Sequence, residues 1–525
     1  MKRFGLLGTL LVVLLTAGRL LAEDSALITY GDVPGLAPSD QYRLRVRLAD
    51  APTNSWRPAF AFITTCKSTP KTEDAYFTDL ANWSNTYINF EMARAVEVEI
   101  ARADGRPIRK ASAHPAGKVE SCVVRDGKAY VRIPQPCLIA VDIDGQMDDQ
   151  DTGLSKRGRY RGPPIHTVTV FANPLLKDRP RLDAPEVHLV KPGERPPSDG
   201  TWRILYFLPG VHDLGPGFPV HANKQYYLPG DALVYGTLNN GGNWKDGHDI
   251  RIFGYGTLSG ARLKHPKFAD PKPADPSSYD PVWICGAQNT TVEGITIADS
   301  AHHSLMLLAG NHADGPTDIR WVKIFTWRAN GDGINPFSNG LVEDCFLRTQ
   351  DDATYVNGRG LRRNVYWNDA NGSVFVLSAL PNRPLVVEDC DVIYARAVWN
   401  KWSGGRIFNM RCEGGGPAGN GVVFRNIRVE DSRPTLQTFF LLMQPLPPYT
   451  GTRTQTRKPG DLGGIRFESI TVAASSVLDE PEILWGMPDG RIRQLSFDGV
   501  SIGGKTITNL NQFRHNEWVE ELRFR

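Results

Sequence analysis

Three aspartates in one short stretch of the chain have the residue types and the spacing for acid–base chemistry. Asp332 stands between two glycines in the run Asn330-Gly-Asp-Gly-Ile334, and Asp351 and Asp352 are adjacent a little further on. Two carboxyl groups that flank a glycosidic bond can divide the work of donating a proton and activating water. We therefore regard Asp332, Asp351 and Asp352 as candidate catalytic residues.

The residues between the two groups indicate how the aspartates can meet. Residues 341–347, Leu-Val-Glu-Asp-Cys-Phe-Leu, alternate enough to form one or two strands. Aspartates that follow strands on neighbouring turns of a solenoid lie side by side, because stacked strands are about 4.8 Å apart. Taken singly, an aspartate in a glycine-rich turn usually bonds its own backbone, and an Asp-Asp pair is usually solvated. The combination, one coil apart, favours a catalytic site.

From about residue 200 onward a short unit recurs that carries apolar residues at its positions 1, 4 and 6. It occurs at Val292/Ile295/Ile297, Ile319/Val322/Ile324, Val342/Cys345/Leu347, Val387/Cys390/Val392, Phe424/Ile427/Val429, Phe467/Ile470/Val472 and Phe497/Val500/Ile502, and Val365 begins a degenerate copy. Periods of about 20 to 50 residues with one strand-like signature each indicate a solenoid. No helical periodicity fills the gaps. We therefore predict an all-β chain with a parallel β-helix over residues 200–525.

Residues 25–195 have a different pattern. Alternating or apolar strand-like segments lie at residues 42–48, 95–100, 129–133, 137–143 and 166–171. Turn residues separate the segments, which predicts an N-terminal β-sandwich domain. Residues 191–200, rich in proline and glycine, mark its end. We expect this domain to brace the solenoid, and polysaccharide binding is the alternative.

The N-terminus predicts export. Lys2 and Arg3 precede a mostly apolar run, so residues 1–22 have the pattern of a signal peptide. No later run is long and apolar enough to cross a membrane. We therefore expect a secreted or periplasmic protein without membrane insertion.

Charge and cysteine spacing exclude several kinds of partner. The formal net charge is +3, so no nucleic-acid footprint is indicated. The seven cysteines include no CxxC spacing, which argues against a zinc site built from them. Cys345 and Cys390 fall on apolar repeat positions, which predicts buried free thiols, while a disulfide among Cys66, Cys122 and Cys137 stays open. We expect a monomer that needs no metal and no cofactor.

Several motifs of the second region resemble those of the right-handed β-helix polysaccharide hydrolases. Its beginning carries Tyr206-Phe-Leu-Pro-Gly-Val211, Tyr227-Leu-Pro-Gly-Asp-Ala232 and Gly254-Tyr-Gly-Thr-Leu-Ser-Gly260, and the likeness runs over residues 200–510. Asn330-Gly-Asp-Gly resembles the Asn-Thr-Asp-Gly motif of the family 28 polygalacturonases. Their Asp-Asp-Cys is Asp351-Asp352-Ala353 here, their Gly-His-Gly is missing, and their Arg-Ile-Lys has only Arg406-Ile407-Phe408 as a counterpart.

A single aspartate followed by an adjacent pair, behind an N-terminal sandwich, is similar to glycoside hydrolase family 49, the dextranase and isopullulanase family. This resemblance implies an inverting hydrolase of an α-glucan. It implies that Asp351 protonates the leaving oxygen and that Asp332 and Asp352 activate water. The alternatives are a polygalacturonase-like hydrolase of an acidic or other polysaccharide, a calcium-dependent lyase, and a non-catalytic polysaccharide-binding β-helix.

Aromatic and amide residues near the aspartates are candidates for sugar contacts. Flat aromatic faces stack on sugar rings and amides bond hydroxyl groups, with core packing and asparagine ladders as the alternatives. The His302-His303 pair follows the coil of Val292, and we expect it near the substrate one coil before Asp332. The candidate substrate-binding residues are Trp327, Asn330, Gln350, Tyr355, Asn357, Trp367, Trp399, Trp402 and His302.

Overall fold

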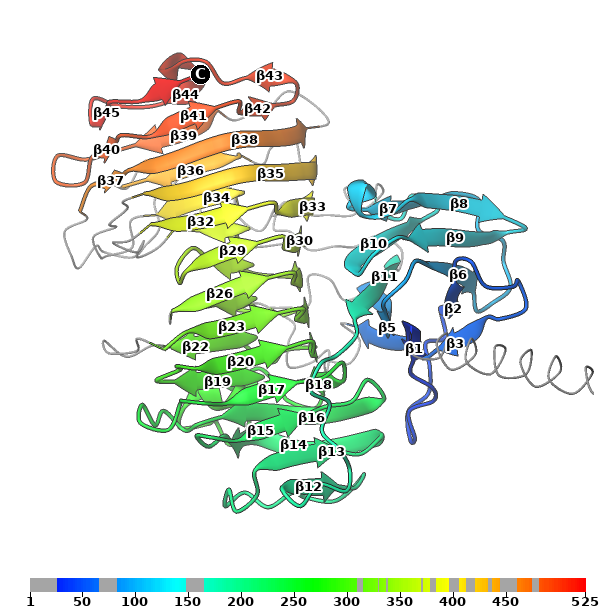
Figure 1. Cartoon of the computed structure of the whole chain (residues 1–525). Coiled ribbons are helices and arrows are strands. Elements are labelled where there is room, and N and C mark those ends of the chain that lie inside the picture. The colour runs from blue at the N-terminus through cyan, green and yellow to red at the C-terminus, as the bar shows by residue number, and fades with distance from the viewer. Residues whose placement is uncertain are drawn as a thin grey trace, which may run out of the picture. The chain divides into compact units, whose positions relative to one another are not determined.

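The computed structural model of the chain contains two compact units (Figure 1). It describes residues 26–65, 83–147, 165–308, 315–328, 330–336, 339–369, 372–377, 384–395, 406–411, 421–432, 437–443, 460–474 and 481–525. The smaller unit comprises Met1–Ile63, Thr86–Gly145 and Thr167–Arg179, and the larger comprises Thr64–Asn85, Gln146–His166 and Pro180–Arg525. The predicted signal peptide, Trp399 and Trp402 lie outside the described residues. No helix within those ranges is long and apolar enough to cross a membrane.

Two antiparallel sheets form the smaller unit. The first has the order β1–β5–β11–β10–β7 with β4 beside β5, and the second has the order β3–β2–β6–β9–β8. Their bounds are β1 (Leu27–Thr29), β2 (Tyr42–Leu48), β3 (Arg57–Ala59), β4 (Phe62–Thr65), β5 (Trp83–Met92), β6 (Val96–Arg102), β7 (Ala111–His114), β8 (Ser121–Arg125), β9 (Lys128–Ile133), β10 (Cys137–Ile143) and β11 (Ile165–Pro174), with a 3-10 turn η2 (Ala116–Lys118).

One hydrophobic core joins the two sheets of the smaller unit. Leu44 and Val46 of β2 pack in the same buried cluster as Ile88 and Phe90 of β5. The intervening Arg45 points outward, where its guanidinium pairs with Glu99 at 2.7 Å. Alternation along each strand thus fills one core between two sheets. The predicted β-sandwich is confirmed.

The larger unit is a parallel β-helix whose strands stack on three faces. The first face contains β12 (Val187–Val190), β13 (Ile204–Phe207), β15 (Gln225–Tyr227), β17 (Arg251–Phe253), β20 (Thr290–Glu293), β23 (Thr317–Arg320), β26 (Gly340–Glu343), β29 (Gly360–Arg362), β32 (Leu385–Glu388), β35 (Val422–Ser432), β38 (Ile465–Ala474), β41 (Ser496–Asp498) and β46 (Arg523–Phe524). The second contains β14 (Gly210–Pro219), β16 (Ala232–Asn239), β18 (Thr257–Ser259), β21 (Thr296–Ala298), β24 (Lys323–Phe325), β27 (Phe346–Thr349), β30 (Val365–Asn368), β33 (Asp391–Ala395), the later parts of β35 and β38, and β42 (Ser501–Ile502).

The third face carries the strands next to the aspartates. It contains the end of β16, then β19 (Val282–Cys285), β22 (Leu305–Leu308), β25 (Ile334–Asn335), β28 (Thr354–Tyr355), β31 (Phe375–Val376), β34 (Phe408–Arg411), β36 (Phe439–Leu442), β39 (Glu482–Trp485) and β44 (Phe513–Arg514). The remaining elements are a small parallel sheet of β37 (Leu462–Gly463), β40 (Ile492–Arg493) and β45 (Val519–Glu520), the strand β43 (Lys505–Thr506), and the 3-10 turns η4 (Pro266–Phe268), η5 (Pro276–Tyr279) and η6 (Leu510–Gln512).

A repeated corner between the first two faces explains the apolar spacing of the sequence repeat. One residue at this corner has a positive φ in each coil, as in Gly294, Trp321, Asp344, Asp389, Asn426, Ser469 and Gly499. That left-handed residue turns the chain between positions 1 and 4 of the unit, so both side chains point inward. Val292, Ile319 and Val342 accordingly pair in register on successive coils and are buried.

The degenerate copy of the repeat begins at Leu361, so the prediction that it begins at Val365 is wrong. Leu361 pairs with Val342 on one side and Val387 on the other. The middle position of this copy is polar, which hid it from an apolar pattern. Its occupant, Asn364, is buried, accepts from Cys345 N at 2.9 Å and donates to Val342 O at 3.2 Å.

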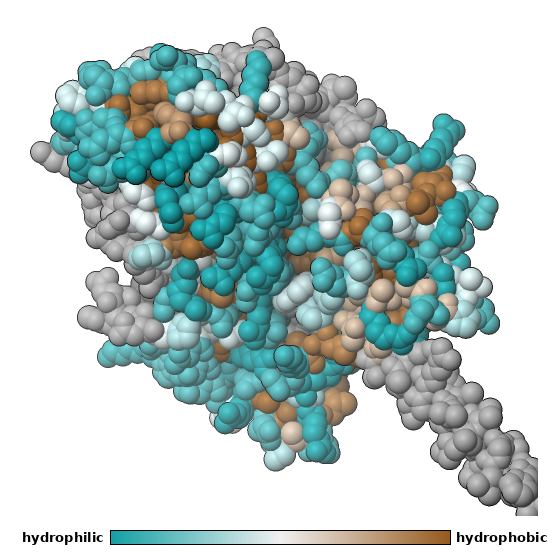
Figure 2. Space-filling view, turned by 45° about the horizontal axis from the view of Figure 1, so that its top comes forward, coloured by the Kyte–Doolittle hydropathy of each residue, from teal (hydrophilic) through white to brown (hydrophobic). Residues whose placement is uncertain are grey.

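Stacked side chains fill the inside of the coils. Phe424, Phe467 and Phe497 stack with ring centroids 5.2 Å apart and interplanar angles of 8° and 16°. Cys345 and Cys390 are buried free thiols, as predicted, and Cys122 and Cys137 are also free. The surface shown in Figure 2 is mostly hydrophilic, with smaller apolar patches. The apolar positions of the repeat therefore form the core.

Candidate active site

The three aspartates lie on two neighbouring coils, just before the strands of the third face. Asp332 precedes β25, and Asp351 and Asp352 lie between β27 and β28. Gly333 N donates to Asp352 O at 2.8 Å, and Ile334 N donates to Ala353 O at 3.0 Å. These bonds make Asp332 and Asp352 neighbours across the stack. The predicted placement one coil apart is confirmed.

Each carboxyl group accepts a hydrogen bond from a group close to the site. Asp351 accepts from Asn330 N at 3.1 Å and from Asp352 N at 2.9 Å. Asp352 accepts from Ser373 N, on the next coil, at 2.6 Å. Asp332 accepts from the Tyr355 hydroxyl at 2.6 Å. These backbone N–H donors fix the orientation of the adjacent pair.

Asp332 is the most buried of the three, at 5% exposure, whereas Asp351 and Asp352 are partly exposed. Burial, and then the charges of Asp351 and Asp352, raise the pKa of Asp332 well above its ordinary value, against the hydrogen bond from Tyr355. Burial followed by the nearby carboxylates also raises the pKa of the Tyr355 hydroxyl, so Tyr355 stays a donor. The raised pKa favours the protonated form of Asp332, and general acid catalysis needs a carboxyl group that holds a proton.

Close backbone approaches require glycine beside two of the aspartates. A Cβ on Gly331 would lie 2.6 Å from Arg328 O and 2.7 Å from Thr326 Oγ1. A Cβ on Gly372, whose φ is +69°, would lie 2.1 Å from Asp352 N. The Thr326 hydroxyl donates to Gly331 O at 2.7 Å and accepts from Gln350 N at 2.9 Å. The two coils are thereby locked together around the carboxyl groups.

Two of the predicted sugar-stacking tryptophans are buried, which corrects that expectation. Trp327 is 1% exposed and Trp367 is 0% exposed, so neither ring offers a face to a sugar. Both pack against the Arg348 guanidinium, 4.7 Å and 3.9 Å from the ring centroids. Arg348 in turn pairs with Asp369 at 2.9 Å, and both side chains are fully buried. The two rings are buried because they stabilise the Arg348 guanidinium, which lies in the interior and needs a carboxylate and π faces around it.

The other predicted binding residues are placed in different ways. Gln350 is 1% exposed, so it does not reach a hydroxyl group at the surface, which corrects its expected role. Asn357 donates to Asn335 Oδ1 on the preceding coil at 3.1 Å, which is the asparagine-ladder alternative. Asn330 is exposed and has a positive φ of 55°, and its backbone N–H serves Asp351. Tyr355 joins the carboxyl cluster through its hydroxyl.

A column of polar residues runs along the stack at the position two residues before each strand of the third face. The backbone bonds from Val282 N to Ser304 O at 3.1 Å and from Ser304 N to Asp332 O at 2.9 Å continue the column toward the N-terminal coils. Six consecutive members are Asp280, His303, Asp332, Asp352, Ser373 and Arg406. Sequence reasoning missed Asp280, although the shared offset from a following apolar strand was the signal that could have found it.

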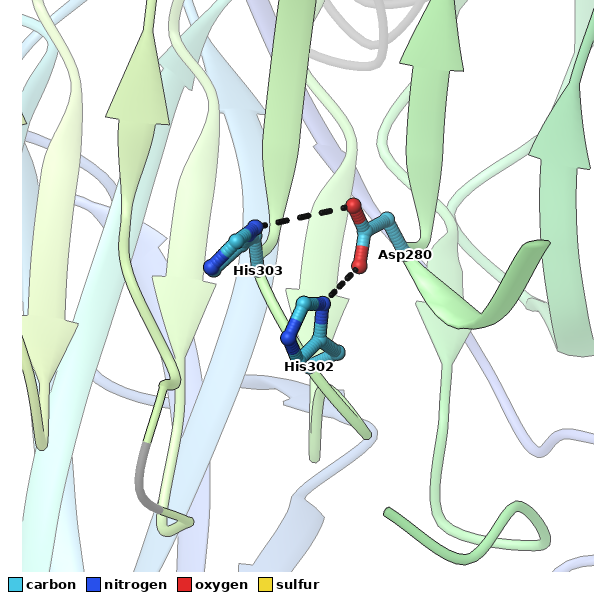
Figure 3. A group of neighbouring side chains, drawn as sticks. All are labelled: Asp280, His302 and His303. Carbon is cyan, nitrogen blue, oxygen red and sulfur yellow. Dashed lines mark hydrogen bonds and ion pairs between the residues drawn. The ribbon is translucent and has the colours of Figure 1, made fainter. Parts of the chain in front are cut away.

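His302 and His303 lie one coil before Asp332, and they face Asp280 on the coil before their own (Figure 3). Burial raises the pKa of Asp280 to about 6. Burial, and then the neighbouring His302 and His265, lower the pKa of His303 to about 3. Burial is also the main reason that the pKa of His265 falls to about 4. His303 and His265 are therefore neutral imidazoles at neutral pH.

Comparison with known proteins finds similarity in fold. No family model and no curated protein matches the chain. Dex49A from Penicillium minioluteum has 17% sequence identity and a TM-score of 0.72, covering 95% of this chain and 99% of that chain. The family 28 exopolygalacturonase of Yersinia enterocolitica has 12% identity, 82% and 96% coverage and a TM-score of 0.36. The hyperthermoactive exopolygalacturonase of Thermotoga maritima has 13% identity, 61% and 84% coverage and a TM-score of 0.34. The likeness to Dex49A spans nearly both whole chains and agrees with the predicted fold.

Proposed function

We propose that the protein is a secreted glycoside hydrolase that cleaves an α-glucan polysaccharide with inversion at the anomeric carbon. One observation carries the proposal: Asp332, Asp351 and Asp352 lie together on neighbouring coils, with one carboxyl group buried beside the other two. Glycoside hydrolysis needs a carboxylic acid on one side of the bond and a carboxylate for water on the other. The resemblance to the dextranase and isopullulanase family supplies the substrate class.

Asp351 is the proposed acid, and Asp332 and Asp352 are the proposed bases. The acid must touch the leaving oxygen, and Asp351 is partly exposed. Burial, and then the charges of Asp351 and Asp352, favour a proton on Asp332, and carboxyl groups that interact in this way share their protons as one set. In one turnover Asp351 gives its proton to the leaving oxygen, the bases take one proton from water, and the set regains its starting state.

A purely binding role accounts less well for the same residues. A binding surface gains nothing from burying Asp332 at 5% exposure next to two like charges. Burial of a carboxyl group with a raised pKa is instead typical of catalytic acids and bases. Export and a monomeric state belong to the same proposal, and N-terminal sequencing of the exported protein and its mass in solution test them.

The deciding experiment is a screen of the purified protein on dextran, pullulan, polygalacturonate and other glycans, with new reducing ends as the readout. We expect new reducing ends from dextran or pullulan. Proton NMR of the first product should show an anomeric configuration opposite to that of the cleaved linkage. A product with retained configuration would refute the mechanism. Release from polygalacturonate alone would refute the α-glucan, and an unsaturated product would identify a lyase instead.

A further inference from the structure

A carboxylate and two imidazoles meet in the described part of the larger unit, with Asp280 two coils and the histidines one coil before Asp332. Asp280 lies between η5 and β19, and His302 and His303 lie in the loop between β21 and β22. His302 Nδ1 is 2.8 Å from Asp280 Oδ1, and His303 Nδ1 is 3.8 Å from Asp280 Oδ2. In Figure 3 both rings turn a nitrogen toward the same carboxylate from one side.

The hydrogen bonds of Asp280 leave one of its two carboxylate oxygens without a hydrogen-bond partner among the described residues. Its side chain is fully buried, and its Oδ2 accepts no hydrogen bond from any residue that the structure describes. Burying a carboxylate in this way is costly unless a cation stands beside it. The two histidines cannot both supply the missing positive charge. Their ring centroids are only 3.9 Å apart, and two protonated rings at that distance would repel each other.

We propose that Asp280, His302 and His303 form a binding site for a divalent transition-metal ion, for which Zn²⁺ is the probe. The candidate ligand atoms all lie within 4.8 Å of one another. Ligands about 2.1 Å from a tetrahedral zinc ion lie roughly 3.4 Å apart, and the two measured nitrogen–oxygen distances fall on either side of that value. Two imidazole nitrogens and one carboxylate are a donor set that such ions prefer over Ca²⁺ or Mg²⁺.

The site leaves a coordination position for an exogenous ligand. Three protein ligands do not complete a tetrahedral shell, and catalytic or ligand-exchanging zinc sites have this composition. The buried carboxylate closes one side, while the side chains of His302 and His303 are 17% and 28% exposed. The open position therefore faces the histidine side, where water or a hydroxyl-bearing ligand can bind. The evidence for the metal site is its own ligand geometry, which does not depend on the proposed hydrolase activity.

Metal uptake by the full chain tests this site without any activity assay. After dialysis against a chelator, the protein is titrated with Zn²⁺ by calorimetry, and with Co²⁺ by its visible absorption, which reports nitrogen and oxygen ligation. We expect one equivalent of each ion. H302A, H303A and the isosteric D280N should each weaken binding at least roughly 100-fold, since loss of outer-shell partners alone weakens metal sites 10- to 100-fold.

The matched control is H248A. His248 also pairs with an aspartate, Asp249, at 2.7 Å. It is not part of the cluster of possible metal ligands, and its side chain is more exposed than those of His302 and His303. This variant should keep full zinc affinity, as should D351N from the neighbouring aspartates. A wild-type protein that takes up no zinc, or one whose affinity is unchanged in H302A and H303A, would overturn the proposal. Zinc uptake by a protein that cleaves no glycan would support the metal site and refute the proposed hydrolase function.

Discussion

Replacing Asp351 by asparagine removes the proposed acid of the carboxyl cluster and leaves the two proposed bases in place. The asparagine keeps one acceptor oxygen, so at most one of the hydrogen bonds from Asn330 N and Asp352 N is lost. One lost hydrogen bond costs about 1 kcal/mol of stability. Loss of a general acid slows hydrolysis roughly 100- to 10,000-fold, which is about 3 to 5 kcal/mol in the barrier. The rate therefore falls far more than the fold is weakened.

The assay compares two substrates that differ in their need for a proton. In a polysaccharide the leaving group is a sugar alkoxide, which is strongly basic and needs a proton from the acid. In an aryl glycoside with an acidic phenol, the phenolate leaves with little need for that proton. D351N should lose its activity on the polysaccharide and keep most of it on the aryl glycoside. D332N and D352N should lose both, because activation of water is needed in either case.

The pH profile of D351N supplies a second readout. The charge of Asp351 is, after burial, the next cause of the raised pKa of Asp332. Removing that charge should lower the pKa of Asp332, and the limb of the rate profile that reports it should move to lower pH. A profile that does not move would show that the two carboxyl groups do not interact.

The matched control is D344N, on the same coil as Asp351. Asp344 pairs with Arg363 at 2.7 Å on the surface and has a positive φ of 55°, which asparagine accepts. It should change stability by less than about 1 kcal/mol and leave both rates unaltered. Equal loss of D351N activity on both substrates, with D332N or D352N spared on the aryl glycoside, would refute the assignment of roles.

Further predictions concern the support of the site and the buried charges of the β-helix. Y355F removes the hydroxyl that donates to Asp332 at 2.6 Å, so the pKa of Asp332 should rise and the limb of the pH–rate profile that reports it should move to higher pH. R348M leaves Asp369 buried without its partner and should cost about 3 to 5 kcal/mol in urea unfolding, whereas joint replacement of both residues by apolar ones should cost less. Burial raises the pKa of Glu482 to about 7, so the native state holds that proton more tightly than the unfolded chain. Stability is then lost as pH rises from 4 toward 8, and E482Q should abolish about 3 kcal/mol of that loss in unfolding curves at both pH values.

The placement of the aspartates could be predicted because it depends on the repeat. Val342 and Leu347 mark one coil in the sequence, and the structure pairs both with their predicted counterparts Ile319 and Ile324. Side chains in register on a parallel stack are neighbours by construction. The prediction was poorer where the middle position was polar, because Asn364 satisfies backbone groups inside the coil and leaves no apolar signal.

The fate of the aromatic and amide candidates could not be read from the sequence. Trp327 and Trp367 stand close to the aspartates along the chain, yet their rings surround Arg348. Nothing local distinguishes a tryptophan that stacks on a sugar from one that stacks on a buried guanidinium, since both present the same face. The partner of the cation, Asp369, comes from the next coil and decides the outcome.

The amino-acid sequence by itself determined the architecture and the meeting of Asp332 with the Asp351–Asp352 pair, because hydrophobic burial of a periodic pattern sets the register of the coils. Only the tertiary structure decided which side chains between coils are buried, paired or open. The in-register pairing of Val282 with Leu305 brings Asp280 beside the loop of His302, 22 residues further on. Whether the rings of that loop turn toward the buried carboxylate depends on how the loop packs onto the stack, which the spacing of residues does not show.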